Sequence, residues 1–171
     1  DGTFLLKWGT DGTGPGQFGG YAPNGICVND SGYIFTASQD GTIQKFTSAG
    51  TFVKRWGGHG AGNGQFNHCY GIWATADELF ASDLNNHRIQ QFTTSGVFVG
   101  SWGTPGTSDG QLAGPFDVAG ETSGDLLVVD VGGPPSTSRI ERFTSSGQYL
   151  ATIGSFGVGA GQLNAPIKVV A

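Results

Sequence analysis

Short apolar runs alternate along this chain with polar turns that contain glycine. Four such runs follow one another in the first third of the sequence, at residues 24–28, 33–37, 42–46 and 51–56. The segments between them read NDSG, SQDG and TSAG, and each supplies the glycine that tight hairpin turns need for a positive φ. The pattern therefore predicts four consecutive strands that pair antiparallel.

This four-stranded plan recurs twice. The second copy covers residues 70–74, 78–82, 88–92 and 97–102, and the third covers 116–119, 125–129, 139–143 and 148–153. Residues 3–8 match only the last strand of a unit, and residues 165–171 match only the first. No stretch of ten or more residues has helical apolar spacing, so the sequence predicts an all-β protein.

A glycine-rich stretch ends each unit. The sequence WGTPGTSDGQL at residues 102–112 has near copies at residues 8–18, 56–66 and 153–163, and the shared glycines Gly16, Gly64, Gly110 and Gly161 are 48, 46 and 51 residues apart. A period of this size indicates a propeller, a solenoid or an array. A sandwich does not require such a repeat, and the turns of a β-helix are much shorter. Four-stranded sheets stacked around an axis form a β-propeller, which is the fold we expect.

The expected organisation is one portion of a propeller over residues 1–171. Residues 1–18 are an outer strand and a crossover to the next blade, residues 19–66, 67–112 and 113–163 are blades, and residues 164–171 are the inner strand of a further blade. Three blades are too few for a closed ring, and the chain begins at Asp1 and contains no Met. We expect either a piece of a longer propeller or copies that assemble through exposed edge strands.

One segment carries a family resemblance. Residues 83–92 read DLNNHRIQQF, with Tyr70-Gly71-Ile72 before them and SGVFVGSWG and DGQL after them. This order of motifs resembles the NHL repeat, and the likeness covers nearly the whole chain. The resemblance implies a propeller, most often of six blades, with four antiparallel strands in each blade.

The signature is incomplete in the first unit. The second unit has Asp83 and Arg88 and the third has Asp130 and Arg139, but the first has Ser38 and Thr42 at these two positions. We expect the Asp/Arg couple to be a structural ion pair, modest in energy where exposed, that pins a hairpin or joins neighbouring blades. Likewise, the recurring Trp8, Trp56 and Trp102 are expected in the core rather than in a ligand site.

Opposite charges occur at one position of the inner strands. Aligning the copies puts Gly25, Gly71, Asp117 and Lys168 in register. The hypothesis is that Asp117 and Lys168 form an ion pair at the mouth of the central channel, or help to bind an ion or a small polar ligand. The alternative is a simple solvated pair.

Binding residues are expected on the face that carries the long loops, because function concentrates on variable loops held by a rigid scaffold. Residues 131–138, which contain Gly-Gly-Pro-Pro, are the least repeat-like part of this face. The candidate binding residues are His68, Tyr70, Asp83, His87, Arg88, Asp117, Asp130, Arg139 and Lys168. No catalytic residue, metal ligand or cofactor is assigned.

The sequence motifs give little support for an enzyme. Some propellers related to this family are lyases with a metal held by histidines, but His59, His68 and His87 have spacings of 9 and 19 residues, which match no zinc pattern. Only His68 is well placed for a channel. No G-x-S-x-G motif occurs, and the glycine-rich loops contain no GK[ST]. The expected function is a non-catalytic scaffold that binds a protein or a glycan; the alternative is an extracellular propeller lyase or hydrolase with a channel metal.

The amino-acid composition argues against some classes of binding partner. The net charge is -5 with only eight Lys and Arg, whereas nucleic-acid binding, as in some animal NHL proteins, needs clustered cations. No apolar run approaches the roughly 20 residues of a membrane span. Cys27 and Cys69 are expected to be small buried thiols, with a disulfide as the alternative. Low charge with abundant Gly, Ser and Thr resembles an extracellular or cell-surface protein.

Overall fold

The structure, a computed structural model, describes residues 2–4, 6–18, 23–133 and 137–171. It contains three antiparallel four-stranded sheets, each with its strands in chain order. The first sheet is β1 (Pro23–Val28), β2 (Ile34–Ser38), β3 (Thr42–Phe46) and β4 (Phe52–Gly57). The second is β5 (Cys69–Ala74), β6 (Glu78–Asp83), β7 (Arg88–Thr93) and β8 (Phe98–Trp102). The third is β9 (Pro115–Gly120), β10 (Leu126–Gly132), β11 (Thr137–Phe143) and β12 (Tyr149–Ile153).

These twelve strands confirm the three predicted units, with boundaries shifted by a few residues. The largest shift is in the third unit, where β10 and β11 continue the ladder to Gly132 and Thr137. One 3-10 helix, η1 (Leu84–Asn86), joins β6 to β7. The fold of the described residues is therefore all-β, as the sequence predicts.

The two flanking strands are not formed. Residues 3–4 and 6–8 have no strand structure, with Leu5 outside the described residues, and residues 165–171 have none either. The predictions at both ends were wrong because a strand needs a ladder partner, and each of these segments lacks the neighbouring strand of its unit. Instead, β13 (Ser155–Phe156) and β14 (Gln162–Leu163) pair in parallel within the last glycine-rich stretch.

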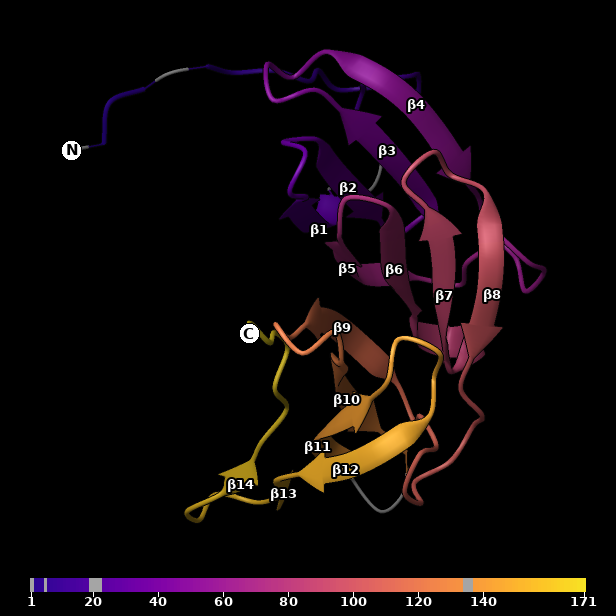
Figure 1. Ribbon diagram of the computed structural model, residues 1–171, viewed down its shortest axis with the longest axis vertical. Helices are drawn as coiled ribbons and strands as arrows, with labels where there is room; N and C mark the ends of the chain where they lie inside the picture. Colours follow the sequence, from indigo (N-terminus) through magenta and orange to yellow (C-terminus); the bar gives the residue numbers. More distant parts are fainter. Residues whose placement is uncertain (1, 5, 19–22, 134–136) are drawn as a thin grey trace.

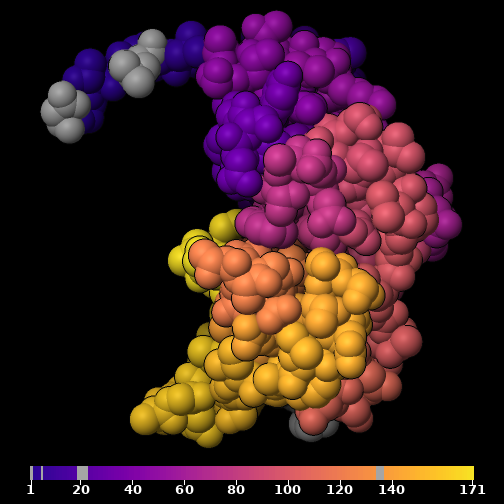
Figure 2. Space-filling view, viewed as in Figure 1, coloured from indigo at the N-terminus to yellow at the C-terminus, as the bar shows by residue number. Residues whose placement is uncertain are grey.

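The three sheets lie side by side in an open arc (Figure 1). Their first strands, β1, β5 and β9, lie on the concave side, and we call them the inner strands. The space-filling view shows the same order of units around a hollowed side, with the C-terminal residues beside β9 (Figure 2). In the described part of the chain the arc does not close into a ring.

The hydrophobic core lies between neighbouring sheets. Between the first and second sheets, Phe35 and Ile43 pack against Ile72, Leu79 and Phe92. A second cluster between the second and third sheets contains Phe80, Ile89, Val118, Leu126 and Phe143. Since each sheet buries its faces only against its neighbours, the units depend on one another for stability.

Each recurring tryptophan joins two units. A Cβ added to Gly50, Gly96 or Gly147, in the turn between the last two strands of a unit, would collide with Trp8, Trp56 or Trp102 of the preceding repeat position. The ring of Trp102 also lies 4.5 Å from that of Phe143, measured between centroids. The predicted packing is thus confirmed in part: all three tryptophans are half-buried, Trp56 and Trp102 pack against the two core clusters, and Trp8 lies against Phe46.

Candidate functional site

The four glycine-rich stretches, which we call crossover loops, share one internal hydrogen bond. The side-chain Oε1 of Gln17, Gln65, Gln111 and Gln162 accepts a bond from the backbone N–H three residues earlier. In the third loop, Gly106 has φ +153°, and a Cβ there would collide with Gln111. Glycine at this position lets the glutamine fold under its own loop, so each crossover is held by local contacts.

The Asp/Arg couple anchors the crossover to the following sheet. Arg88 Nε lies 2.7 Å from Asp83 Oδ2, and Arg139 Nε lies 3.1 Å from Asp130 Oδ2. Arg139 also donates to the carbonyls of Thr107, Ser108 and Gln111 in its crossover loop. The structural interpretation of this couple is confirmed.

Burial distinguishes these couples from exposed ion pairs, which are modest in energy. The carboxylates of Asp83 and Asp130 are fully buried, because the crossover loop covers them. Burial raises the pKa of Asp130, although bonds from the Gly114 and Ala113 backbone and the nearby Arg139 oppose the shift. The structure thus places four candidate binding residues, Asp83, Arg88, Asp130 and Arg139, in the scaffold.

The first unit, which lacks the couple, uses other side chains. Asp40 Oδ1 accepts bonds from the backbone and hydroxyl of Thr42. Arg55, on β4, donates to the carbonyl of Thr13 in the first crossover loop. A different arginine therefore holds this loop from the outer strand.

The crossover loops and the connections between second and third strands share one face, which we call the loop face. Gly58, in the second crossover loop, donates to the carbonyl of Gly41 between β2 and β3. The N–H groups of Leu84 and Val131 donate to the carbonyls of His68 and Gly114, which lie between a crossover loop and the next inner strand. The predicted arrangement of long loops is confirmed. In the segment 131–138, residues 134–136 lie outside the described residues.

A cavity of about 260 Å³ opens where the inner strands begin, next to the loop face. Its lining residues are Asn24, Tyr70, Phe116, Asp117, Ile167 and Lys168. The rings of Tyr70 and Phe116 lie 4.8 Å apart at an angle of 35°. Aromatic surface beside polar groups is the usual lining of a ligand pocket.

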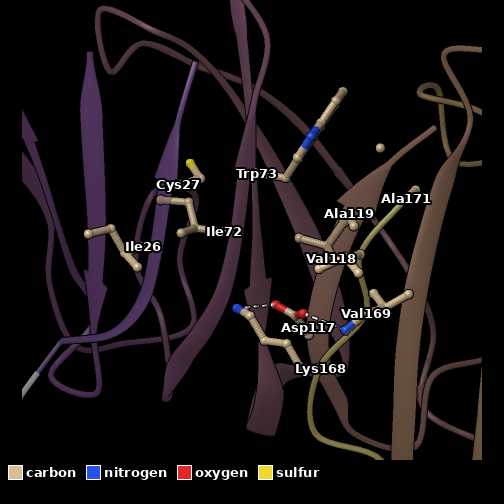
Figure 3. A pocket seen from close by; sticks show the side chains of 12 residues that line it. Ile26, Cys27, Ile72, Trp73, Asp117, Val118, Ala119, Lys168, Val169 and Ala171 are labelled. Atoms are coloured by element: carbon tan, nitrogen blue, oxygen red, sulfur yellow. Dashed lines mark hydrogen bonds and ion pairs between the residues drawn. The ribbon is translucent and has the colours of Figure 1, made fainter. Parts of the chain in front are cut away.

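Asp117 and Lys168 form the predicted ion pair. Lys168 Nζ lies 3.3 Å from Asp117 Oδ1, and the Val169 N–H donates to Asp117 Oδ2 at 2.9 Å (Figure 3). The Asp117 side chain is 3% exposed and that of Lys168 is 55% exposed, so only the lysine is solvated. Asp117 fits at this depth because a Cβ on Gly71 would collide with its backbone.

Asp117 and Lys168 also line a second cavity, of about 190 Å³. The second cavity lies further along the inner strands, between Ile26, Cys27 and Ile72 on one side and Val118, Ala119 and Val169 on the other (Figure 3). Its lining is mainly apolar apart from Asp117 and Lys168. Asp117 and Lys168 therefore belong to the walls of both cavities.

The three histidines lie apart. His68 has a left-handed backbone (φ 67°) and lies between Gln39 and Asn85. Ala165, at the equivalent repeat position, is also left-handed, so this conformation belongs to the position rather than to the imidazole. His87 ends η1, with Nδ1 2.8 Å from the carbonyl of Ala113. His59 lies in the second crossover loop.

Within the described residues, no group of three or more His, Cys, Asp or Glu side chains is arranged to hold a metal ion. Cys27 and Cys69 are both free thiols, with Cys69 buried and Cys27 half-buried. Burial raises the pKa of Cys27 to about 12 and that of Cys69 well above its usual value. Both cysteines therefore remain thiols at neutral pH.

Some contributors to the site were missed from the sequence. Asn24 and Phe116 line the loop-face cavity, and alignment with Tyr70 at the start of each inner strand could have indicated them. Gln44, Gln90 and Glu141 also hold the crossover loops, as described below. Their signal was the repeated TIQ, RIQ and RIE at the start of the third strand.

No protein-family model matches the sequence, and no curated protein sequence matches it. In the part of the chain that the structure describes, no helix has the length and apolar character needed to cross a membrane.

Proposed function

We propose that this chain is part of an NHL-type β-propeller that acts as a non-catalytic interaction scaffold, located outside the cell or at its surface. It binds a protein or a glycan through the loop face. The observation that carries the proposal is the cavity of about 260 Å³ beside this face, with Tyr70 and Phe116 in its wall. Paired aromatic rings next to a charged pair offer a stacking surface and polar groups to one partner.

The rigidity of the loop face supports the same function. Side chains of the sheets bind the crossover loops through several backbone groups, as Arg88 does with Gly62 and Gln65. A preorganised surface loses little conformational entropy when a partner binds. The Asp/Arg couples thus contribute to binding indirectly, by fixing the loops around the cavity.

The repeat supports the propeller. Consecutive sheets already pack face to face through β1, β5 and β9, and each further unit would extend the arc in the same way. A ring of such sheets leaves the starts of the inner strands around one opening. Tyr70, Phe116 and Lys168 would then lie at that opening.

The binding proposal is tested with a glycan array and an array of extracellular protein domains, followed by titration of each positive partner. We expect Tyr70→Ala to weaken binding by about two- to tenfold, since it removes an aromatic contact of about 0.5–1.5 kcal/mol. Tyr70→Phe, which keeps the ring, separates stacking from the hydroxyl.

Ser48→Ala is the control, because Ser48 is exposed in the turn between β3 and β4 on the opposite face. It should leave the affinity unchanged, and thermal melting should show that all variants remain folded. A partner whose affinity responds to Ser48→Ala but not to Tyr70→Ala would place binding on the wrong face and contradict the proposal.

A further inference from the structure

One repeat position carries two glutamines and a glutamate. Gln44 on β3, Gln90 on β7 and Glu141 on β11 are each the third residue of the repeated TIQ, RIQ or RIE. In all three, Oε1 accepts a hydrogen bond from a crossover glycine. The bonds come from the N–H groups of Gly16, Gly64 and Gly110, at 2.8, 2.9 and 3.2 Å respectively. The bond from the crossover glycine to Oε1 is thus the same in all three units.

The other terminal atom of this side chain, Nε2 in the glutamines and Oε2 in the glutamate, differs in its bonding. Gln90 Nε2 donates to the carbonyl of Gln65 at 2.6 Å and to Asp83 Oδ2 at 3.0 Å. Gln44 Nε2 donates to the carbonyl of Gln17 at 3.0 Å. Glu141 has an oxygen, Oε2, where the glutamines have this donor, and the oxygen is buried without a hydrogen-bond partner. An ionised carboxylate at this position cannot donate.

Buried charges around Glu141 do not balance if both carboxyl groups are ionised. Arg139 lies 3.1 Å from Glu141 Oε1 through Nη2 and 3.1 Å from Asp130 Oδ2 through Nε. A single guanidinium on β11 therefore faces two fully buried carboxyl groups, since Asp130 projects from β10. Asp109, in the crossover loop, adds a negative charge, and Thr152, opposite Glu141 on β12, is uncharged.

Asp130 is better placed than Glu141 to remain ionised. The N–H of Gly114 donates to Asp130 Oδ1 at 2.8 Å, and Arg139 donates to Oδ2, so both of its oxygens are satisfied. Hydrogen bonds to both oxygens favour the charged form, whereas an unsatisfied buried oxygen favours protonation. Any proton shared by this cluster should therefore lie on Glu141.

We propose that Glu141 retains a proton on Oε2 up to neutral pH in the folded protein. The proton is donated to the carbonyl of Gln111 or to Asp130 Oδ2, the equivalents of the two acceptors of Gln90 in the second unit. The protonated glutamate thereby completes the third copy of the contact between sheet and crossover loop. Loss of this proton makes the third crossover sensitive to pH.

The energetics agree with this geometry. Burial raises the pKa of Glu141 from 4.5 to about 7; Arg139 and the Gly110 N–H oppose the shift, and Asp130 and Asp109 add to it. In the unfolded chain the group loses its proton near 4.5. Between these two values folding takes up a proton, so the stability falls as pH rises through the window and becomes level above it.

The direct test is the carboxyl ¹³C chemical shift of Glu141 in the intact chain, followed by NMR against pH. We expect a midpoint near 7 instead of 4.5. The second test is the pH dependence of urea unfolding in Glu141→Gln. Across the window, the unfolding equilibrium constant of the wild type should rise on the order of a hundredfold relative to that of the variant.

Gln90→Glu is the matched variant, because Asp83 and Arg88 reproduce the surroundings of Glu141 in the second unit. It should introduce a second carboxyl group that titrates well above 4.5 and a new fall in stability with pH. A Glu141 midpoint near 4.5 would overturn the proposal even if neither variant folds. An unchanged pH dependence of unfolding in Glu141→Gln would also overturn it.

Discussion

At the scale of single residues, Arg139 and Arg142 carry the same charge but lie in different surroundings, so their contributions to stability should differ. Arg139 is 9% exposed and binds three crossover carbonyls together with Asp130 and Glu141. Arg142, three residues further along β11, pairs with Glu121 and Asp125 but is 36% exposed. Because water replaces lost contacts only at the exposed site, the two pairs should differ in their contribution to stability.

Arg139→Ala should lower the free energy of unfolding by about 3–5 kcal/mol, since it leaves the buried carboxylate of Asp130 without its cation. Arg142→Ala should lower it by about 1 kcal/mol or less. Urea denaturation of both variants at one pH measures the difference. Equal losses would show that the buried arginine does not anchor the crossover.

At the scale of elements, the turns between the last two strands of each unit have two requirements. Gly147 needs a positive φ (+86°) and has no room for a Cβ because Trp102 lies against it. Gly124, in the turn between β9 and β10, has nearly the same φ (+89°) but nothing within 4 Å of an added Cβ. Comparing substitutions at Gly124 and Gly147 therefore separates the cost of backbone strain from the cost of disturbed packing between units.

Gly124→Ala should cost about 1–2 kcal/mol of stability from the left-handed backbone alone. Gly147→Ala should cost about 1–3 kcal/mol more, because its methyl group overpacks the tryptophan. Thermal unfolding measures the two losses, and tryptophan fluorescence reports the displacement of Trp102. A Gly147 variant no less stable than the Gly124 variant would contradict the role of this contact.

At the scale of the whole molecule, the two ends of the arc expose apolar surfaces that are buried wherever two sheets pack together. Ile26 on β1 is 59% exposed, whereas Ile72 and Val118, at the same position of β5 and β9, are 3% and 2% exposed. The difference arises because Ile72 and Val118 each pack against a preceding sheet. Ile153, which takes the place of the tryptophans at the other end, is also exposed. Such apolar ends favour association with a further sheet.

If these ends bind other copies of the chain, Ile26→Ser should weaken self-association by about tenfold or more, since a buried isoleucine contributes about 1.5–3 kcal/mol. Val97→Ser is the control, because Val97 is 58% exposed but lies in the turn before β8. Sedimentation over a range of concentrations gives the association constants. A wild-type chain that stays monomeric throughout would contradict self-association.

The sequence alone determined the twelve strands of the three units and the crossover loops between them. These features depend on local properties, namely alternating apolar residues, turn glycines and a repeat whose copies support one another. Asp117 and Lys168 were also paired correctly, because the repeat register brings equivalent positions of neighbouring units together. In each case the signal was present within one unit or in the alignment of units.

Only the tertiary structure decided features that depend on a neighbour distant in the chain. Residues 3–8 and 165–171 have strand-like sequences, yet no strand forms in residues 3–4, 6–8 and 165–171 because no partner strand lies beside these described residues. Asp83 and Asp130 were candidate binding residues, but the folded chain buries both carboxylates. Glu141 differs from Gln90 by one functional group, and its need for a proton follows from the burial and charges that the folded units create around it.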